Sequence, residues 1–220
     1  MVNSAVVPVA ASRLALLLLD FQYGVLDTIR NSADVLSRAE VALCWARQQR
    51  VQVAHVRVAF TEEDFARVPA HNKALRQVVE SRRFADGSRE AAIHSRVAPQ
   101  GRELVVRKTR FGAFSTTELH RLLQELGIDT LILAGISTSG VVLSTVRDAL
   151  DRDYEIYVLA DSIADHDPQL HDALVERLLR QSVNVIDTGD LPSLAGAWHD
   201  PTPRDRGILA LSHTDFQDDR

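Results

Sequence analysis

Six short apolar runs along the chain predict the strands of a buried sheet. The first, at residues 14–19, reads "LALLLL" and is apolar without interruption, which is typical of a strand covered on both faces. Five more runs of similar length are apolar and mostly rich in β-branched residues, at 51–58, 103–108, 130–135, 155–161 and 183–187. We therefore expect one six-stranded, mainly parallel sheet.

Segments with helical spacing separate most of these runs. They cover residues 31–50, 115–127, 140–152 and 168–181. Ser115 and Glu118 predict a capping box for the second helix, Gly127 predicts its end, and Pro168 is placed to open the last one. Alternating strands and helices predict an α/β fold, a doubly wound three-layer sandwich with right-handed crossovers.

Two segments depart from this alternation. Residues 61–99 are more polar and read as irregular structure with short helical pieces, a length that favours a function such as covering a pocket. Asn72 and Lys73 would reach over the site from there. We expect one domain over 1–198 and a polar tail over 199–220, whose small apolar centre "GILAL" suggests an arm docking on a neighbouring subunit.

Composition narrows the class of protein. The 220 residues are 45% hydrophobic and 25% charged, as in ordinary globular domains. A net charge of −5 argues against a nucleic-acid partner, which normally requires a basic surface. No apolar run approaches the roughly 18–20 residues of a membrane span, and the start lacks the charged region of a signal peptide. We expect a cytoplasmic protein without a membrane partner.

The carboxyl ends of the predicted strands carry the candidate chemistry, since ligands of open parallel sheets bind there. Asp20 follows the first strand, Lys108 ends the third, and a turn over 135–141 follows the fourth. An aspartate and a lysine meeting at adjacent strand ends would pair, and the pairing would lower the aspartate pKa. Taken singly, each residue is equally compatible with a helix cap or a surface ion pair.

Three separated blocks resemble the isochorismatase-like hydrolase superfamily, also called the cysteine hydrolase family. They read "ALLLLDFQYGVLD", "VVRKTRFGAFSTTEL" and "DTLILAGISTSGVVLSTVRDALDRDYEIYVLADSIAD". The resemblance implies the doubly wound fold, a small-molecule substrate, no cofactor, and a homodimer or homotetramer. It also implies an Asp–Lys–Cys triad, in which Asp20 and Lys108 match the first two members. The position of the cysteine, six residues after Gly135, is Val141.

Three hypotheses account for a valine at this position. The first is acid-assisted hydrolysis of a small carboxylated metabolite, with Asp20 as general acid, Lys108 beside it and no covalent intermediate. The second is hydrolysis of an amide or other C–N bond by an activated water or a serine, with Ser139 considered before Ser137 and Ser144. The third is a ligand-binding relative without turnover.

The resemblance also suggests how the rest of the site is built. A non-proline cis peptide at Ser139–Gly140 would aim backbone N–H groups at the substrate oxygen. The side chains expected to line the substrate pocket are Phe21, Gln22, Tyr23, Arg110, Phe111 and Phe114.

We expect no metal. The only cysteine, Cys44, has the context of a helical core residue, so neither an intramolecular disulfide nor a cysteine-based metal site is possible. His55 is isolated on its strand, and the spacing of His166 and His171 does not suit two ligands on one helix face.

Overall fold

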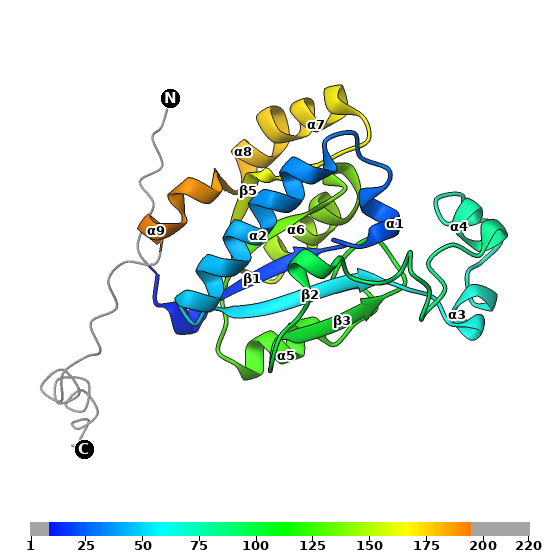
Figure 1. Cartoon of the computed structure of the whole chain (residues 1–220), viewed down its shortest axis with the longest axis horizontal. Coiled ribbons are helices and arrows are strands. Elements are labelled where there is room, and N and C mark those ends of the chain that lie inside the picture. Colours follow the sequence, from blue (N-terminus) through cyan, green and yellow to red (C-terminus); the bar gives the residue numbers. More distant parts are fainter. Residues whose placement is uncertain (1–8, 195–220) are drawn as a thin grey trace, which may run out of the picture.

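The strands form one sheet in the order β3-β2-β1-β4-β5-β6 in the computed structural model, which describes residues 9–194 (Figure 1). Every neighbouring pair of strands is parallel, so the predicted parallel α/β sheet is confirmed. The strands are β1 (Leu14–Leu19), β2 (Gln52–Val58), β3 (Leu104–Lys108), β4 (Thr130–Ile136), β5 (Glu155–Ala164) and β6 (Asn184–Ile186).

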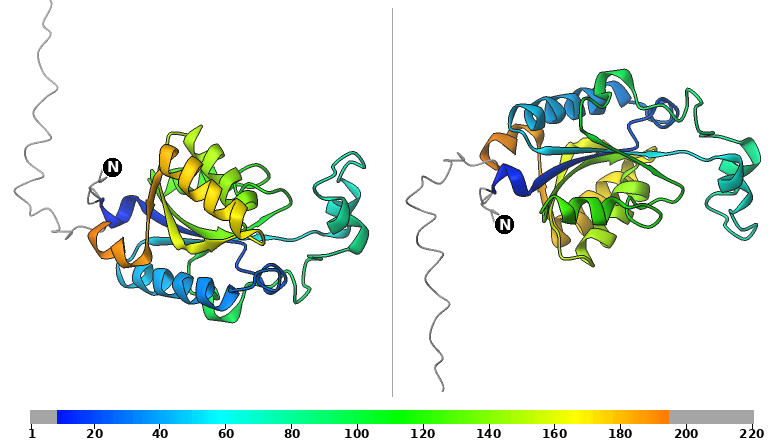
Figure 2. Two further views of the ribbon diagram at one scale, coloured as in Figure 1. Left: turned by 90° about the horizontal axis from the view of Figure 1, so that it is seen from above. Right: turned by 90° about the horizontal axis from the view of Figure 1, so that it is seen from below.

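Helices cover both faces of this sheet (Figure 2). One face packs against α2 (Ser32–Gln48) and the short α9 (Leu191–Leu194). The other face carries α5 (Leu119–Glu125), α6 (Leu143–Leu150), α7 (Pro168–Leu174) and α8 (Arg180–Ser182). Alternate residues of β1 join the two hydrophobic layers, and none of its side chains is more than 1% exposed. This two-sided burial explains why the strand is apolar without interruption.

The helix predicted over 115–127 is shorter than expected, and the predicted capping box is wrong. Helix α5 begins at Leu119, and the Ser115 hydroxyl donates to the carbonyl of Gly112 instead of capping a helix. The predicted stop at Gly127 is confirmed by its φ of +70°, which favours glycine. Pro168 opens α7, as predicted, behind Asp167, whose carboxylate accepts from two backbone N–H groups.

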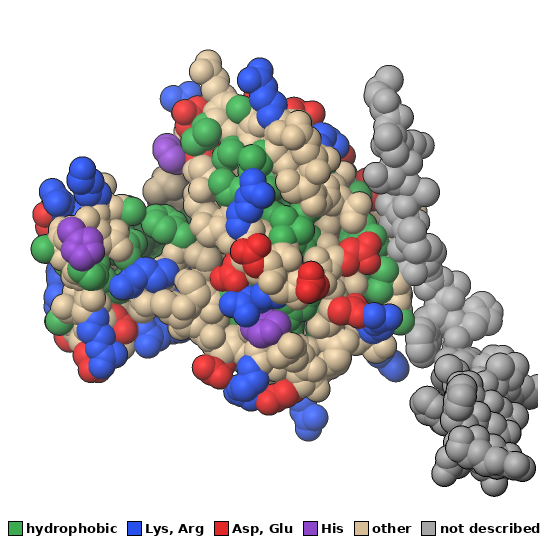
Figure 3. Space-filling model, turned by 180° about the vertical axis from the view of Figure 1, so that it is seen from behind, with side chains coloured by type: hydrophobic (Ala, Val, Ile, Leu, Met, Phe, Trp, Pro, Cys, Tyr) green, Lys and Arg blue, Asp and Glu red, His purple; other side chains and the backbone are tan. Residues whose placement is uncertain are grey.

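The chain between β2 and β3 forms a lobe beyond the carboxyl ends of the strands (Figures 1 and 3). It contains α3 (Glu62–Ala66), which begins with a capping box of Thr61 and Asp64, and α4 (Arg76–Ser81). A small hydrophobic cluster of its own, including Phe60, Phe65 and Phe84, joins the lobe to the sheet. The short α1 (Tyr23–Leu26) follows β1 at the same edge.

Two predictions concern residues outside the described range. The polar tail over 199–220 and the domain boundary at 198 both lie there and stay predictions. Within residues 9–194, no helix has the length and apolar character required to cross a membrane.

Candidate active site

Asp20 and Lys108 meet at the carboxyl edge of the sheet, as the sequence predicts. The Lys108 Nζ donates to Asp20 Oδ2 at 2.7 Å and to the carbonyl of Arg110 at 3.1 Å. The two strand ends are not adjacent, because β2 lies between β1 and β3. Their separation is therefore about two strand spacings, roughly 9–10 Å, a gap that the long lysine side chain spans.

The backbone turns sharply at Asp20. Its φ is +57°, in the left-handed region that aspartate adopts more readily than most residues. The backbone N–H donates to Val56, and the carbonyl accepts from Gln22 at 2.7 Å. This turn holds the carboxyl group in place at the end of the strand.

The environment of Asp20 raises the pKa of its carboxyl group. Burial causes the rise, and the nearby Lys108 ammonium and the Val58 backbone N–H oppose it without cancelling it. We predicted a lowered pKa from the ion pair alone, and that prediction is wrong because desolvation outweighs the pairing. Among the described residues, Asp20 Oδ1 is buried and accepts no hydrogen bond of ordinary geometry, since the Val58 N–H donates to Gln22.

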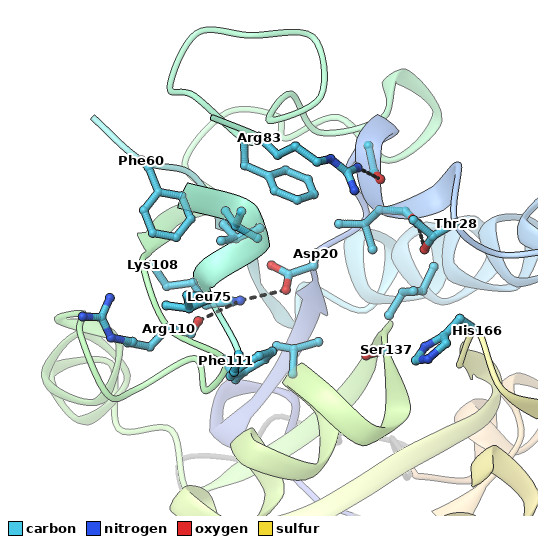
Figure 4. A pocket seen from close by; sticks show the side chains of 18 of the residues that line it. Asp20, Thr28, Phe60, Leu75, Arg83, Lys108, Arg110, Phe111, Ser137 and His166 are labelled. Carbon is cyan, nitrogen blue, oxygen red and sulfur yellow. Dashed lines mark hydrogen bonds and ion pairs between the residues drawn. The ribbon is translucent and has the colours of Figure 1, made fainter. Parts of the chain in front are cut away.

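A cavity of about 230 Å³ opens over this pair (Figure 4). Lys108, Arg110 and Phe111 lie on one side of Asp20, while Thr28, Ser137 and His166 lie on the other. The lobe adds Ala74, Leu75, Val78, Arg83 and Phe84, and most of the remaining wall is apolar. A cavity of this size suits a small metabolite.

Val141 lies in the wall of the same cavity, within a π-helical turn over Thr138–Val142 that leads from β4 into α6. Its side chain is buried and offers neither a nucleophile nor a proton. The cis peptide bond is Ile136–Ser137 rather than Ser139–Gly140, so that predicted position is wrong. An added Cβ at Gly140 would lie 2.7 Å from Ser137 Oγ, so the glycine makes room for this hydroxyl group.

Four predicted pocket residues point elsewhere. Phe21 packs in the α2-side hydrophobic core, because the turn at Asp20 sends the chain back toward the sheet. The Gln22 amide bonds the backbone of Val58 and Ala91. Tyr23 packs beside His94, and its hydroxyl oxygen accepts from a backbone N–H. Phe114 stacks on Tyr154 in the opposite core. Arg110 and Phe111 do line the cavity.

Ser139 and Gly140 do not line the cavity either. The backbone N–H and the hydroxyl group of Ser139 both donate to Asp165 Oδ2, at 2.7 and 2.6 Å. The Gly140 N–H donates to the carbonyl of Ser137. These groups fix the start of the turn, which is the structural role that serines often have at a helix start.

Sequence reasoning missed several cavity residues. Arg83, Phe60 and Leu75 come from the lobe, and the prediction that Asn72 and Lys73 reach over the site is wrong because Ala74 and Leu75 do so. His166, which follows β5, was considered only as a metal ligand, whereas Ser137, which follows β4, was considered as a nucleophile after Ser139. For His166 the available signal was its position five residues beyond the predicted strand end at Asp161, near the carboxyl edge of the sheet.

No group of three or more His, Cys, Asp or Glu side chains within residues 9–194 is arranged to hold a metal ion. His55 is buried in β2, with Nε2 2.9 Å from Glu103. Cys44 is exposed rather than a core residue, which corrects the expectation from its helical context.

Comparison with known proteins places these features in a family. The isochorismatase domain model matches residues 14–190, which is most of the chain. The chain is 30% identical over 164 residues to a maleamate amidohydrolase of Pseudomonas putida, covering 72% of this chain and 76% of that protein. It is 36% identical over 106 residues to a ureidoacrylate amidohydrolase of Methylorubrum extorquens, covering 48% of this chain and 42% of that protein.

A solved structure shares the fold. The crystal structure of a cysteine hydrolase from Pseudomonas syringae pv. phaseolicola aligns with a TM-score of 0.80, over 89% of this chain and 98% of that chain, at 20% identity. The predicted superfamily and fold class are thereby confirmed. The chain belongs to the isochorismatase family of hydrolases.

Proposed function

We propose that this protein hydrolyses a small carboxylated metabolite by an acid-assisted, non-covalent route at Asp20. The observation that carries the proposal is the buried Asp20 carboxyl group, with Oδ1 accepting no hydrogen bond, at a cavity that Val141 also lines. Val141 stands where the family resemblance places the nucleophile. A carboxyl group with a raised pKa retains its proton at higher pH than an exposed aspartate, as a general acid requires. Lys108 holds the other oxygen and fixes the direction of the acid.

A carboxylated substrate is supported by the cationic groups around the cavity. Arg110 has no acidic partner within 4 Å among the described residues, and its Nη1 donates only to a backbone carbonyl. Arg83 borders the cavity from the lobe and is held by Glu90 and by the carbonyl of Gly24. A guanidinium group without an acidic partner favours a carboxylate, which it can bind through two parallel hydrogen bonds.

A second candidate is hydrolysis of a C–N bond. The similarity to two proteins named as amidohydrolases favours this reaction, and so does the presence of Ser137 in the cavity. The substrates in those names are themselves carboxylated compounds with a C–N bond, so both candidates agree on the charge of the ligand. They differ in the bond broken and in the nucleophile.

Isochorismate, other vinyl ethers, maleamate and ureidoacrylate form a panel that tests both candidates, with the products identified by mass spectrometry. For the acid route, Asp20→Asn should lower kcat by about 10²–10⁴-fold, since an amide cannot transfer the proton. Asp161→Asn is the control, because Asp161 is a half-buried aspartate of β5 that bonds Thr188 outside the cavity. Undiminished turnover in Asp20→Asn would contradict the acid route.

The products also separate the candidates. Cleavage of vinyl ethers alone supports the acid route in its simplest form. Cleavage of maleamate or ureidoacrylate, with a covalent adduct on Ser137 after rapid quenching, would replace it with the serine route. Tight binding of the panel compounds without turnover would support a ligand-binding relative. A cytoplasmic location and a homo-oligomeric state stay predictions.

A further inference from the structure

His166 is a cavity residue to which neither the family resemblance nor the proposed acid route gives a role. It follows β5 and lies at the cavity mouth, on the other side of Asp20 from Lys108 (Figure 4). Its side chain is 69% exposed, whereas the adjacent Asp165 side chain is fully buried. The cavity therefore has the buried Asp20–Lys108 pair on one side and the exposed imidazole of His166 on the other.

Asp165 is the charged neighbour of the His166 ring. His166 Nδ1 lies 2.7 Å from Asp165 Oδ1, an ion-pair contact. The negative charge of the carboxylate stabilises the imidazolium that forms when the ring accepts a proton. A neutral imidazole has one unprotonated nitrogen that can accept it.

Asp165 itself is fixed as a carboxylate. Burial would raise its pKa, but the hydrogen bonds from the Ser139 hydroxyl and backbone outweigh burial and lower it. The same bonds tie Asp165 to the π-helical turn that contains Val141. The carboxylate beside His166 is therefore held by the same turn that contains Val141.

We propose that His166, with the Asp165 carboxylate beside it, is the general base that activates water in the hydrolysis. This inference rests on the proposed function, because it supplies the base that an acid-assisted, non-covalent reaction still requires. A carboxylate beside a histidine stabilises the imidazolium, which is a recurrent feature of catalytic bases. In this assignment His166 is the catalytic residue, and Asp165 supplies the neighbouring negative charge.

The proton balance of the step is simple. Asp20 gives a proton to the substrate, and the oxygen of a water bonds the activated carbon while one of its protons goes to the unprotonated ring nitrogen of His166. The bond between that carbon and its oxygen or nitrogen leaving group then breaks. The leaving group departs with the proton from Asp20 or, where Asp20 has protonated a vinyl carbon, with the proton of the newly added hydroxyl group. The sum is substrate plus one water giving two products. The exposed His166 ring returns its proton through solvent, and Asp20 is protonated again.

The first test needs no turnover. In ¹⁵N-labelled protein, Asp165→Asn should change the chemical shifts of the His166 ring nitrogens. Maleate, a dicarboxylate that cannot be hydrolysed, should shift the His166 ring nitrogens and leave those of His94 unchanged. His94 is the matched control, because it is half-buried, accepts from a backbone N–H and lies outside the cavity. His166 ring nitrogens that do not respond to maleate would overturn the proposal.

The second test uses the panel compound that the wild type hydrolyses fastest. His166→Gln should lower kcat by about 10²–10⁴-fold, with a much smaller change in KM, and added imidazole should partly restore His166→Ala. His94→Gln should leave both constants unchanged. A His166→Gln variant within about threefold of the wild-type kcat would overturn the assignment.

The variants also separate this inference from the proposed function. Activity lost in His166→Gln but retained in Asp20→Asn would refute Asp20 as the acid and leave His166 as the base. The reverse pattern would refute His166 alone. An adduct on Ser137 that requires His166 would identify the serine hydroxyl, rather than water, as the group that His166 deprotonates, and His166 would remain the base.

Discussion

Replacing Lys108 with methionine removes the only cationic partner of Asp20 within residues 9–194 while retaining much of the side-chain volume. The pair is 2.7 Å apart, and its side chains are only 2% and 7% exposed. Breaking such a buried pair leaves one uncompensated charge and typically costs about 3–5 kcal/mol of unfolding free energy. We expect a loss of this size near neutral pH, which is a large share of the stability of a typical domain.

The loss should depend on pH in a defined direction. The pKa of folded Asp20 is already above its ordinary value of 3.8, and without Lys108 it should rise further because both lowering interactions with Lys108 are gone. The folded variant then binds more protons than the unfolded chain over a wider range, so its stability falls as pH rises through that range.

Urea unfolding of both proteins, followed by tryptophan fluorescence from about pH 4 to pH 8, measures this difference. The deficit should be largest at the alkaline end and shrink toward pH 4, where Asp20 is protonated. Arg121→Met is the control, since Arg121 pairs with Glu118 and Glu125 on the protein surface. The double variant with Asp20→Asn should recover much of the stability. A deficit that is equal at every pH would refute the electrostatic reasoning.

Two further substitutions test other parts of the fold. Burial raises the pKa of Glu103, but bonds from Arg47 and His55 outweigh burial and lower it to about 2. Glu103→Gln should therefore cost about 1–3 kcal/mol above pH 4.5, and urea unfolding should show this difference disappearing as pH falls toward 2. Equal loss at low and neutral pH would contradict this. An added Cβ at Gly135 would lie 2.6 Å from the Cβ of Leu19, the residue before Asp20. Gly135→Ala should cost about 1–3 kcal/mol and lower kcat by displacing Asp20, whereas Gly189→Ala, with open space around it, should do neither.

The sequence predicted the sheet and the Asp20–Lys108 pair because both follow from strand ends. An apolar run marks where a buried strand stops, and parallel strands bring all their carboxyl ends to one edge. Strand order was not visible in the same pattern, so the intervening β2 and the reach required of Lys108 emerged only from the structure. The raised pKa of Asp20 also depends on how deeply the pair is buried, which spacing does not specify.

Residues that follow a site residue in sequence were poor guides to the cavity. Phe21 comes directly after Asp20, but the left-handed turn there directs it into the core. His166 reaches the cavity from a loop after β5, and Arg83 reaches it from the lobe. These contacts depend on the way in which long segments fold back over the edge of the sheet. Neither the hydrophobic periodicity nor the local spacing of residues predicts how such segments fold.

Val141 and the raised pKa of Asp20 are parts of one environment. A cysteine thiolate in this wall would place a second charge in the cavity, whereas the buried valine keeps the wall apolar. An apolar wall favours the neutral form of the nearby carboxyl group and so maintains the proton that the acid route needs. It also leaves the nucleophile to be water, for which the described cavity offers His166 as an exposed base. The valine therefore fits a division of the chemistry between a buried acid and a base at the cavity mouth.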